Sequence, residues 1–471
     1  MVANPTVKTS DHRLTTFLDF SVSRNSWWVL LLLVLIGTGL RLYNLTYQSL
    51  WYDELHSMIP TNPENTILAV IEYAKTDQPP LFFIYLHTFF KFFGYTEFNG
   101  RLASAIVGIL GIPAVYLLGR AVKNQETGLA AALFTTVNYY HIYYSQDVRF
   151  YGLLFLLSCL SFLFFIRAIK TEGWTDYLFY FVCTTLLLYT HYYGIIIFVS
   201  QAAILLAVSI RKKKARSLFV SLAVGLGVAI CYAPWLPTVL QDSKIQSFWI
   251  EKPTLYFVVT YLLEYMGRDY ISCTLFLAMG VLFIRNWLSP DKKTPLEYLV
   301  VVLWILFSYG IPFVWSLVDT PLLYVRYTMV TLPAWLVLLA IGYQGIQQRN
   351  LKYAVIAIIF ISSIANLTLR INYYSRIEKA QYRQVSALVQ KANTTSLPVY
   401  SSSSWHWNFY FQNMGYRVQQ LTLDTLPDRF WLVQSHSHQE MIKEVNELLR
   451  HFNIRERHEF HQANALLFTK K

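Results

Sequence analysis

Residues 27–40 read WWVLLLLVLIGTGL, an apolar run without a charged side chain. With its flanks it reaches the roughly 20 mostly apolar residues that a helix needs to cross a bilayer. The run has no small-residue cleavage site, which indicates a retained first span and not a removed leader. Comparable runs recur as far as residue 370. The pattern predicts a polytopic α-helical membrane protein of about eleven spans, at 26–44, 102–119, 127–145, 149–167, 175–192, 194–210, 217–237, 270–287, 296–317, 327–345 and 352–370.

The composition of the chain points the same way. Of its 471 residues, 55% are hydrophobic and only 14% are charged, whereas a soluble domain carries about 25% charged residues. The net charge of +12 could suggest nucleic acid, but the Lys and Arg residues cluster in short loops between apolar runs. The positive-inside rule explains that distribution, so we predict membrane lipids and no nucleic acid as partners.

The basic loops also predict the orientation. Alternate loops carry the basic residues, among them Arg120, Lys123, Arg167, Lys170 and the run 211–216, which places these loops and the N-terminus in the cytoplasm. The other loops then face outward, and an odd number of spans puts the C-terminus outside too. The outward loops are 45–101, a turn around 145–149, another near 192–194, 238–269 and 318–326.

Several outer segments have structure of their own in this prediction. Residues 62–75 and 79–94 are apolar, aromatic and too short to span, which is typical of interfacial helices, and 253–267 is a third candidate. Pro79 and Pro80 can open the second of these helices. After about residue 370 polar residues increase, and the chain divides into a transmembrane domain, 1–370, and a small α/β domain, 371–471. In the latter we predict helices at 377–391, 405–413 and 438–452 and strands at 397–401, 416–422, 429–434 and 455–468.

The four cysteines are predicted to pack among these spans. They lie inside or at the ends of apolar runs, without metal-site spacing, so we expect no disulfide or cysteine-bound metal. They are Cys159, Cys183, Cys231 and Cys273.

Polar groups at the outer ends of the spans are the candidate functional residues, because charge near a bilayer usually faces a cavity or a partner. The predicted topology places five groups on the outer face. They are Trp51 to His56; Asp77 to Pro80 with Glu97 to Arg101; Tyr143 to Tyr151; Thr190 to Tyr193; and Asp319 to Tyr327.

The residue types leave more than one chemistry open. Asp53 and Glu54 could be a base, metal ligands or a solvated pair, and His56 could share a helix face with Asp53. The planar forks of Arg101, Arg149 and Arg326 suit phosphate oxygens, although single arginines also reach lipid headgroups or pair with nearby acids.

In this order, the segments resemble the GT-C membrane glycosyltransferases, specifically the glycosyltransferase family 39-like group. Protein O-mannosyltransferases and bacterial lipid A aminoarabinose transferases belong to that group. The chain departs from many relatives in having Gln78 where they have His, and Asp147 often aligns with Glu. The motifs are Arg41 to Tyr43, Ser49 to Ser57, Gln78 to Leu81, Gly94 to Arg101, Tyr144 to Arg149, Tyr189 to His191, and Arg326-Tyr327 followed by Pro333.

The resemblance implies a GT-C-like catalytic membrane domain that moves a sugar from a polyprenyl-phosphate donor to an acceptor hydroxyl. The acceptor would be a lipid, a glycan or a protein, and the reaction would take place at the outer face of a cell (plasma or inner) membrane. A divalent metal ion is left open. The implied roles are Asp53 as catalytic acid–base residue; Glu54 orienting it or binding a metal; Arg101, Arg149 and Arg326 on the donor phosphate; Asp147, Tyr144 and Gln78 on sugar or acceptor; and His191 and His56 contacting metal or phosphate.

Two other functions would share these features. A transporter or flippase of lipid-linked sugars would use the same outer cavity, but it would move its cargo without releasing polyprenyl phosphate. A silent membrane scaffold would use only the outer tail. The paired acids and the absence of a visible internal repeat favour the enzyme.

Overall fold

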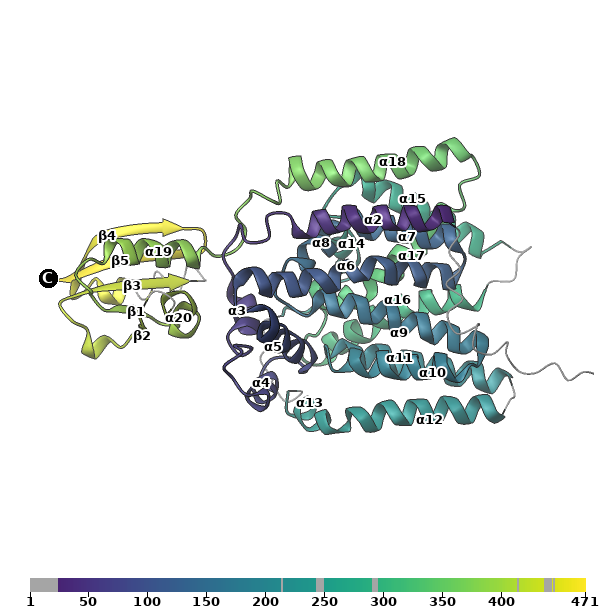
Figure 1. Ribbon diagram of the computed structural model, residues 1–471, viewed down its shortest axis with the longest axis horizontal. Helices are drawn as coiled ribbons and strands as arrows, with labels where there is room; N and C mark the ends of the chain where they lie inside the picture. The colour runs from purple at the N-terminus through teal and green to yellow at the C-terminus, as the bar shows by residue number, and fades with distance from the viewer. Residues whose placement is uncertain are drawn as a thin grey trace, which may run out of the picture.

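A bundle of long helices fills one half of the molecule, and a small α/β domain lies at one of its ends (Figure 1). The computed structural model describes residues 24–212, 215–242, 250–289, 295–412, 415–435, 443 and 445–471. The bundle helices are α2 (Arg24–Leu42), α6 (Glu97–Val122), α7 (Gln125–Val137), α9 (Tyr151–Thr171), α10 (Trp174–Leu188), α11 (Tyr193–Lys212), α12 (Ala215–Tyr232), α15 (Tyr270–Trp287), α16 (Leu296–Val318), α17 (Leu332–Tyr343) and α18 (Arg349–Ala365).

Each of the eleven predicted spans falls on helical residues of this bundle. Among the described residues, eight helical segments are long and apolar enough to cross a membrane. The segments of α2 and α10 are apolar but shorter. Large apolar side chains lie exposed on the bundle surface, as lipid-facing residues must be; examples are Leu32, Leu35, Leu222, Leu226, Leu277, Val281 and Ile361.

The span predicted at 127–145 is not one continuous helix. Asn138 leaves the helical conformation, ends α7, and begins the short α8 (Tyr139–Ser145). Its side chain accepts a hydrogen bond from the backbone N–H of His141, which is the N-cap arrangement that asparagine favours. The interruption places the end of α8 directly before the turn that carries Asp147 and Arg149.

Short helices cover the end of the bundle that faces the α/β domain (Figure 1). The predicted interfacial helices are present with shorter bounds, and the second one begins after the two prolines as expected. A further helix, α3, was not predicted, because its seven residues are too few to show a periodic pattern. The elements are α3 (Tyr52–Met58), α4 (Ile67–Ala74), α5 (Leu81–Phe93), η2 (Ala233–Trp235), α13 (Leu236–Asp242), α14 (Phe257–Tyr265), η3 (Val325–Thr331) and η4 (Asn366–Arg370).

The C-terminal domain is a five-stranded sheet of order β2-β1-β3-β5-β4 with helices packed on it. Strand β1 runs parallel to β2 and β3, whereas β5 is antiparallel to β3 and β4. The elements are α19 (Tyr382–Ala392), β1 (Val399–Ser401), α20 (Ser404–Gln412), β2 (Val418–Gln420), η5 (Leu423–Thr425), β3 (Arg429–Ser435), β4 (Phe452–Phe460) and β5 (Ala463–Lys470).

Two predictions for this domain were wrong. The final strand, predicted at 455–468, is a hairpin whose turn contains Gln462 with a positive φ of 50°. The helix predicted at 377–391 starts at Tyr382 instead, because the backbone N–H groups of Glu378 and Lys379 bond to the Gln48 side chain and not to a helix. Of the helix predicted at 438–452, residues 438–442 and 444 lie outside the described residues, residues 443 and 445–448 are helical, and β4 begins already at Phe452.

Candidate active site

The polar segments predicted for the outer face meet at the end of the bundle that carries α3. An ion pair between Asp53 and Arg326 joins α3 to η3, with 2.6 Å between Oδ2 and the guanidinium. A second pair, Asp77 with Arg149 at 3.0 Å, joins the loop before α5 to the turn before α9. His191 packs between the rings of Phe150 and Tyr327, each 4.9 Å away between centroids. Residues far apart in the chain therefore form one cluster.

Glu54 and Arg101 form a completely internal ion pair in this cluster. The Glu54 side chain is 0% exposed, and Nε and Nη2 of Arg101 each donate to one of its oxygens at 2.8 Å. The remaining donors of Arg101 go to the backbone carbonyls of Leu45, Gln48 and Ser49. All five guanidinium N–H groups are thus used within the protein. The structure leaves Arg101 no donor for a phosphate, contrary to the predicted role.

The oxygens of Glu54 are equally occupied. Besides Arg101, they accept from the backbone N–H groups of Trp51 and Val148 and from the Lys379 ammonium group. Burial opposes the charged form, but the Arg101 and Lys379 cations outweigh it and hold the pKa of Glu54 at about 2. This environment gives Glu54 a structural task and leaves it no lone pair for a metal or substrate.

Asp147 is also buried, but only one of its oxygens is bonded. Oδ1 accepts from the Trp51 indole at 2.9 Å and from Lys379 at 3.0 Å. Oδ2 is buried and has no hydrogen-bond partner. Burial raises the pKa of Asp147, and the Lys379 cation only partly offsets this. A buried carboxylate oxygen without a donor is poised to accept a hydrogen bond from a ligand.

Asp53 lies on the accessible side of the cluster. Its side chain is 19% exposed and that of Arg326 is 16% exposed. Arg149 donates to the backbone carbonyl of Asp53 at 3.3 Å, and its own Nε is buried without a partner. The guanidinium of Arg326 also lies over the rings of Tyr324 and Tyr327. Asp53 and Arg326 are therefore partly exposed charged groups of the cluster, and Arg149, whose side chain is 7% exposed, lies beside them.

The remaining predicted residues line the same region. The buried Gln78 Oε1 and His191 Nε2 have no hydrogen-bond partner. Tyr144 packs edge-on against Tyr151, with ring centroids 4.6 Å apart. His56 Nδ1 lies 2.6 Å from the Tyr73 hydroxyl, and burial lowers the pKa of His56.

Lys379 is the main site residue that the sequence analysis missed. It follows the last span in a polar stretch, where nothing distinguishes it from a surface lysine. Only the folded chain shows that its side chain, 8% exposed, inserts between Glu54 and Asp147.

Among the described residues, no group of three or more His, Cys, Asp and Glu side chains is arranged to hold a metal ion. The sequence leaves open whether a divalent metal ion takes part in the reaction, and its involvement stays a prediction.

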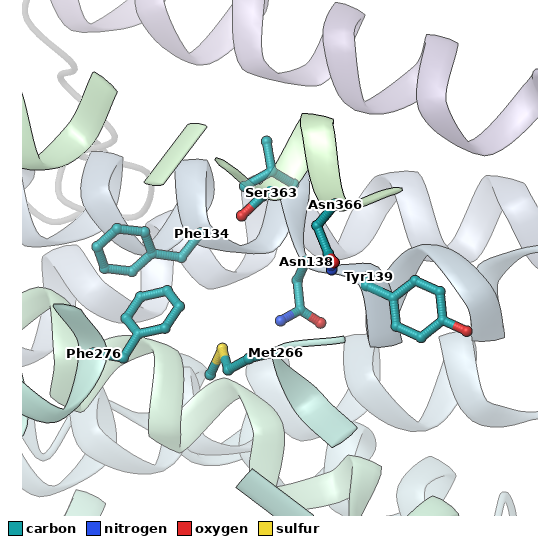
Figure 2. Close-up of a pocket in the computed structure, with 8 residues that line it drawn as sticks. Phe134, Asn138, Tyr139, Met266, Phe276, Ser363 and Asn366 are labelled. Atoms are coloured by element: carbon teal, nitrogen blue, oxygen red, sulfur yellow. The ribbon is translucent and has the colours of Figure 1, made fainter. Parts of the chain in front are cut away.

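A separate small pocket surrounds the break between α7 and α8 (Figure 2). Asn138, between α7 and α8, and Asn366, the first residue of η4, point into it and donate to the backbone carbonyls of Tyr265 and Gly267. Its other lining residues, Phe134, Val137, Tyr139, Met266, Phe276 and Ser363, carry no charge. This pocket contains none of the acid and arginine residues above, so it is a packing feature of the interrupted span.

Comparisons with known proteins define the class of this fold. The structure aligns with that of ArnT from Cupriavidus metallidurans in the apo state, with a TM-score of 0.66, 11% identity, and coverage of 94% of this chain and 98% of ArnT. ArnT bound to undecaprenyl phosphate aligns with a TM-score of 0.62 at 12% identity, over 94% of this chain and 98% of ArnT. The oligosaccharyltransferase AglB from Archaeoglobus fulgidus, in complex with an inhibitory peptide and a dolichol-phosphate, aligns with a TM-score of 0.52 at 12% identity, over 84% of this chain and 64% of AglB. The chain has the GT-C fold.

Part of the chain is similar in sequence to known proteins. Residues 77–237 match the family described as dolichyl-phosphate-mannose-protein mannosyltransferase. A dolichyl-phosphooligosaccharide-protein glycotransferase 2 from Pyrococcus furiosus is 31% identical over 238 residues, which is 44% of this chain and 30% of that protein. The chain thus spans about a third of the length of this curated relative. The predicted resemblance to GT-C membrane glycosyltransferases is confirmed.

Proposed function

We propose that this protein is a glycosyltransferase that moves a sugar from a polyprenyl-phosphate donor to an acceptor hydroxyl at the outer face of a cell membrane. The observation that carries the proposal is the accessible pair of Asp53 and Arg326 beside Arg149. It combines a carboxylate that can take a proton with two cations that suit a phosphate leaving group. Family and fold matches to enzymes of lipid-linked sugars support the same class of reaction.

Arg326 and Arg149 are the proposed ligands of the donor phosphate. Both guanidinium groups lie in the same cluster beside Asp53, and their positions on different segments suit binding of one phosphate from two sides. As the bond from the anomeric carbon to the phosphate oxygen breaks, negative charge grows on the phosphate and the two cations stabilise it. Arg101 is left out of this role because Glu54 and the backbone use all its donors.

Asp53 is the proposed acid–base residue. The acceptor hydroxyl attacks the anomeric carbon, a new glycosidic bond forms, and Asp53 takes the hydroxyl proton while polyprenyl phosphate leaves. Before the donor binds, Asp53 pairs with Arg326. A phosphate that draws Arg326 to itself would free the carboxylate for the acceptor.

Asp147 and Gln78 are proposed to hold hydroxyl groups of the sugar or the acceptor. Each presents a buried oxygen that accepts no hydrogen bond within the protein. Sugar hydroxyls are donors that could satisfy both, and Tyr144 beside Tyr151 offers an aromatic surface next to them.

The test compares lipid-linked sugars and surface glycans, by mass spectrometry, in cells with and without the protein and with variants at two outer acids. We expect Asp53→Asn to keep membrane level and topology but to lose transfer by about 100-fold or more. Asp319→Asn is the matched control, because Asp319 is exposed at the end of α16, and it should transfer normally.

Undiminished transfer by Asp53→Asn would overturn the assignment of the acid–base residue. The rival function, a flippase, predicts that lipid-linked sugar crosses the membrane without release of polyprenyl phosphate. Detection of free polyprenyl phosphate that depends on the protein therefore separates the two functions.

A further inference from the structure

The segment 372–381 carries a cation from the C-terminal side of the chain into the site. It leaves the bundle after η4 and leads into α19. Gln48 Oε1 accepts hydrogen bonds from the backbone N–H groups of Glu378 and Lys379, each at 2.8 Å, and the Ser49 hydroxyl donates to the carbonyl of Ala380. The segment is therefore held against the loop that leads to Asp53.

Contacts on either side of this segment fix its position further. The guanidinium of Arg383 on α19 pairs with Glu97 on α6 at 3.2 Å and donates to the backbone carbonyls of Thr46 and Tyr47. The Tyr410 hydroxyl on α20 accepts from the backbone N–H of Leu50 at 2.7 Å. The C-terminal domain is thus docked on the same loop.

Lys379 balances the buried charges of the site. Its Nζ lies 3.0 Å from Glu54 and 3.0 Å from Asp147. These two carboxylates and the two cations Arg101 and Lys379 make a buried set of zero net charge. Arg101 bonds to Glu54 and to carbonyls, so Lys379 is the charged partner that the structure gives Asp147. A buried carboxylate that loses its cation becomes strongly unfavourable in its charged form.

We propose that Lys379 is a positioning residue for sugar transfer, which holds Asp147 ionised and in place, so that the site is complete only when the C-terminal segment is docked. This inference rests on the proposed function. Lys379 acts through Asp147 and does not touch the donor phosphate, which falls to Arg149 and Arg326. The C-terminal domain then contributes Lys379 to the site.

The test uses the full chain in detergent with three variants and total lipid extract of the source cells as donor and acceptor. The measurement is the initial rate of polyprenyl phosphate release per folded protein, at several extract concentrations. We expect Lys379→Gln to lower the maximal rate by about 10- to 100-fold, as misplacement of a reacting group does, with little change in the extract concentration for half-maximal rate. Lys379→Arg should restore most of the rate. Lys391→Gln, an exposed position on α19, is the control and should behave as wild type.

A pH profile separates positioning from a purely structural role. The titratable groups around Asp147 are Lys379 and Tyr373 from the segment, Glu54 from α3, and Tyr143 and Tyr144 from α8, while the Trp51 indole donates to it. Without the cation the pKa of Asp147 rises further, so the acidic limb of the rate should move to higher pH in Lys379→Gln but not in Lys379→Arg. If Lys379→Gln lowers only the amount of folded protein and leaves rate and profile unchanged, the inference is overturned. If wild type releases no polyprenyl phosphate, the proposed function fails instead.

Discussion

Asp53 and Glu54 are neighbours on α3, and the helix turns them toward different environments. Successive residues of an α-helix are about 100° apart around its axis. Glu54 consequently points into the protein, where it is 0% exposed, whereas Asp53 keeps 19% of its side chain accessible. The two acids are therefore not a solvated pair. Glu54 forms an internal ion pair with Arg101, and the acid–base role of Asp53 stays a prediction.

The buried carboxylate gives a prediction about stability. Breaking a buried ion pair by removing one partner costs about 3–5 kcal/mol, because the other charge stays buried. We expect Glu54→Gln to lower the free energy of unfolding by about that amount, measured as thermal unfolding in detergent. Glu72→Gln is the control. Its partner Lys75 is 44% exposed and Glu72 is 69% exposed, so it should change stability by less than about 1 kcal/mol.

The lowered pKa of Glu54 predicts how the stability of the fold depends on pH. The pKa of Glu54 is about 2 in the fold against 4.5 for the free side chain. A carboxyl with a lowered pKa stabilises the fold above its unfolded pKa, and this contribution disappears as pH falls from about 4.5 toward 2. The wild-type melting temperature should therefore fall over that range, and the part due to this residue should be missing in Glu54→Gln. Identical slopes in the two proteins would contradict the assigned charge state.

The partly buried cation Arg326 gives a prediction about donor binding. Hydrogen bonds to charged groups contribute about 1.5–3 kcal/mol, so Arg326→Ala should weaken apparent donor affinity by about 10- to 100-fold. Arg326→Lys should lose less, because it keeps the charge but not the planar fork. The control is Arg376→Ala, whose side chain is 60% exposed and pairs with Glu378. Donor dependence that is unchanged in Arg326→Ala would argue against its contact with phosphate.

At the scale of elements, the break between α7 and α8 explains how a turn near the bilayer is held in place. Arg41, fully buried on α2, donates to the backbone carbonyls of Gly37, Thr135 and Thr136. The last two carbonyls lie at the C-terminal end of α7, where helix carbonyls lack partners. Gln146 then donates to the carbonyl of Arg41. The motif at Arg41 is thus structural, and it fixes the turn that carries Asp147 and Arg149.

Close helix packing makes one glycine of the bundle testable. A Cβ atom on Gly342 of α17 would lie 2.0 Å from the backbone carbonyl oxygen of Met279 on α15. Because a backbone atom cannot move aside cheaply, Gly342→Ala should push the two helices apart and destabilise the fold by about 1–3 kcal/mol. Gly280→Ala on α15 is the control, since a Cβ there meets nothing within 4 Å. Equal melting temperatures for the two variants would show that α15 and α17 pack less closely than described.

Sequence patterns predicted the elements better than the contacts between them. Apolar runs such as 27–40 locate spans because lipid exposure demands a long, uncharged stretch. The charge pattern of the loops predicted that Asp53, Arg149 and Arg326 lie at the same end of the helix bundle, and the structure confirms this placement. The ion-pair partners were not predictable, since Arg101 and Arg326 carry the same chemistry and differ only in what surrounds them. Lys379 could not be identified as a site residue from the sequence for the same reason, because only its surroundings in the fold distinguish it from a surface lysine.

At the scale of the whole molecule, the site is assembled from both domains. Its charged residues come from α3, from the turns before α5 and α9, from η3, and from the segment before α19. The C-terminal domain lies at that end of the bundle (Figure 1). The loop 45–101 and the C-terminal domain must therefore be on the same side of the membrane, whichever side that is.

The positive-inside rule predicts that this side is the outer one, and cysteine labelling tests the prediction. Helix α6 has 26 residues and starts at Glu97, beside Arg383 of the C-terminal domain. At about 1.5 Å per residue it carries the chain about 39 Å away, so Lys123 lies at the opposite face.

In a Cys231→Ser background, which removes the exposed native thiol, an impermeant maleimide should label Ser402→Cys in intact cells. Lys123→Cys should react only after permeabilisation, although both positions are exposed. The reverse labelling pattern would place the site in the cytoplasm and exclude transfer at the outer face, while labelling of both positions in intact cells would contradict a fold in which α6 crosses the membrane.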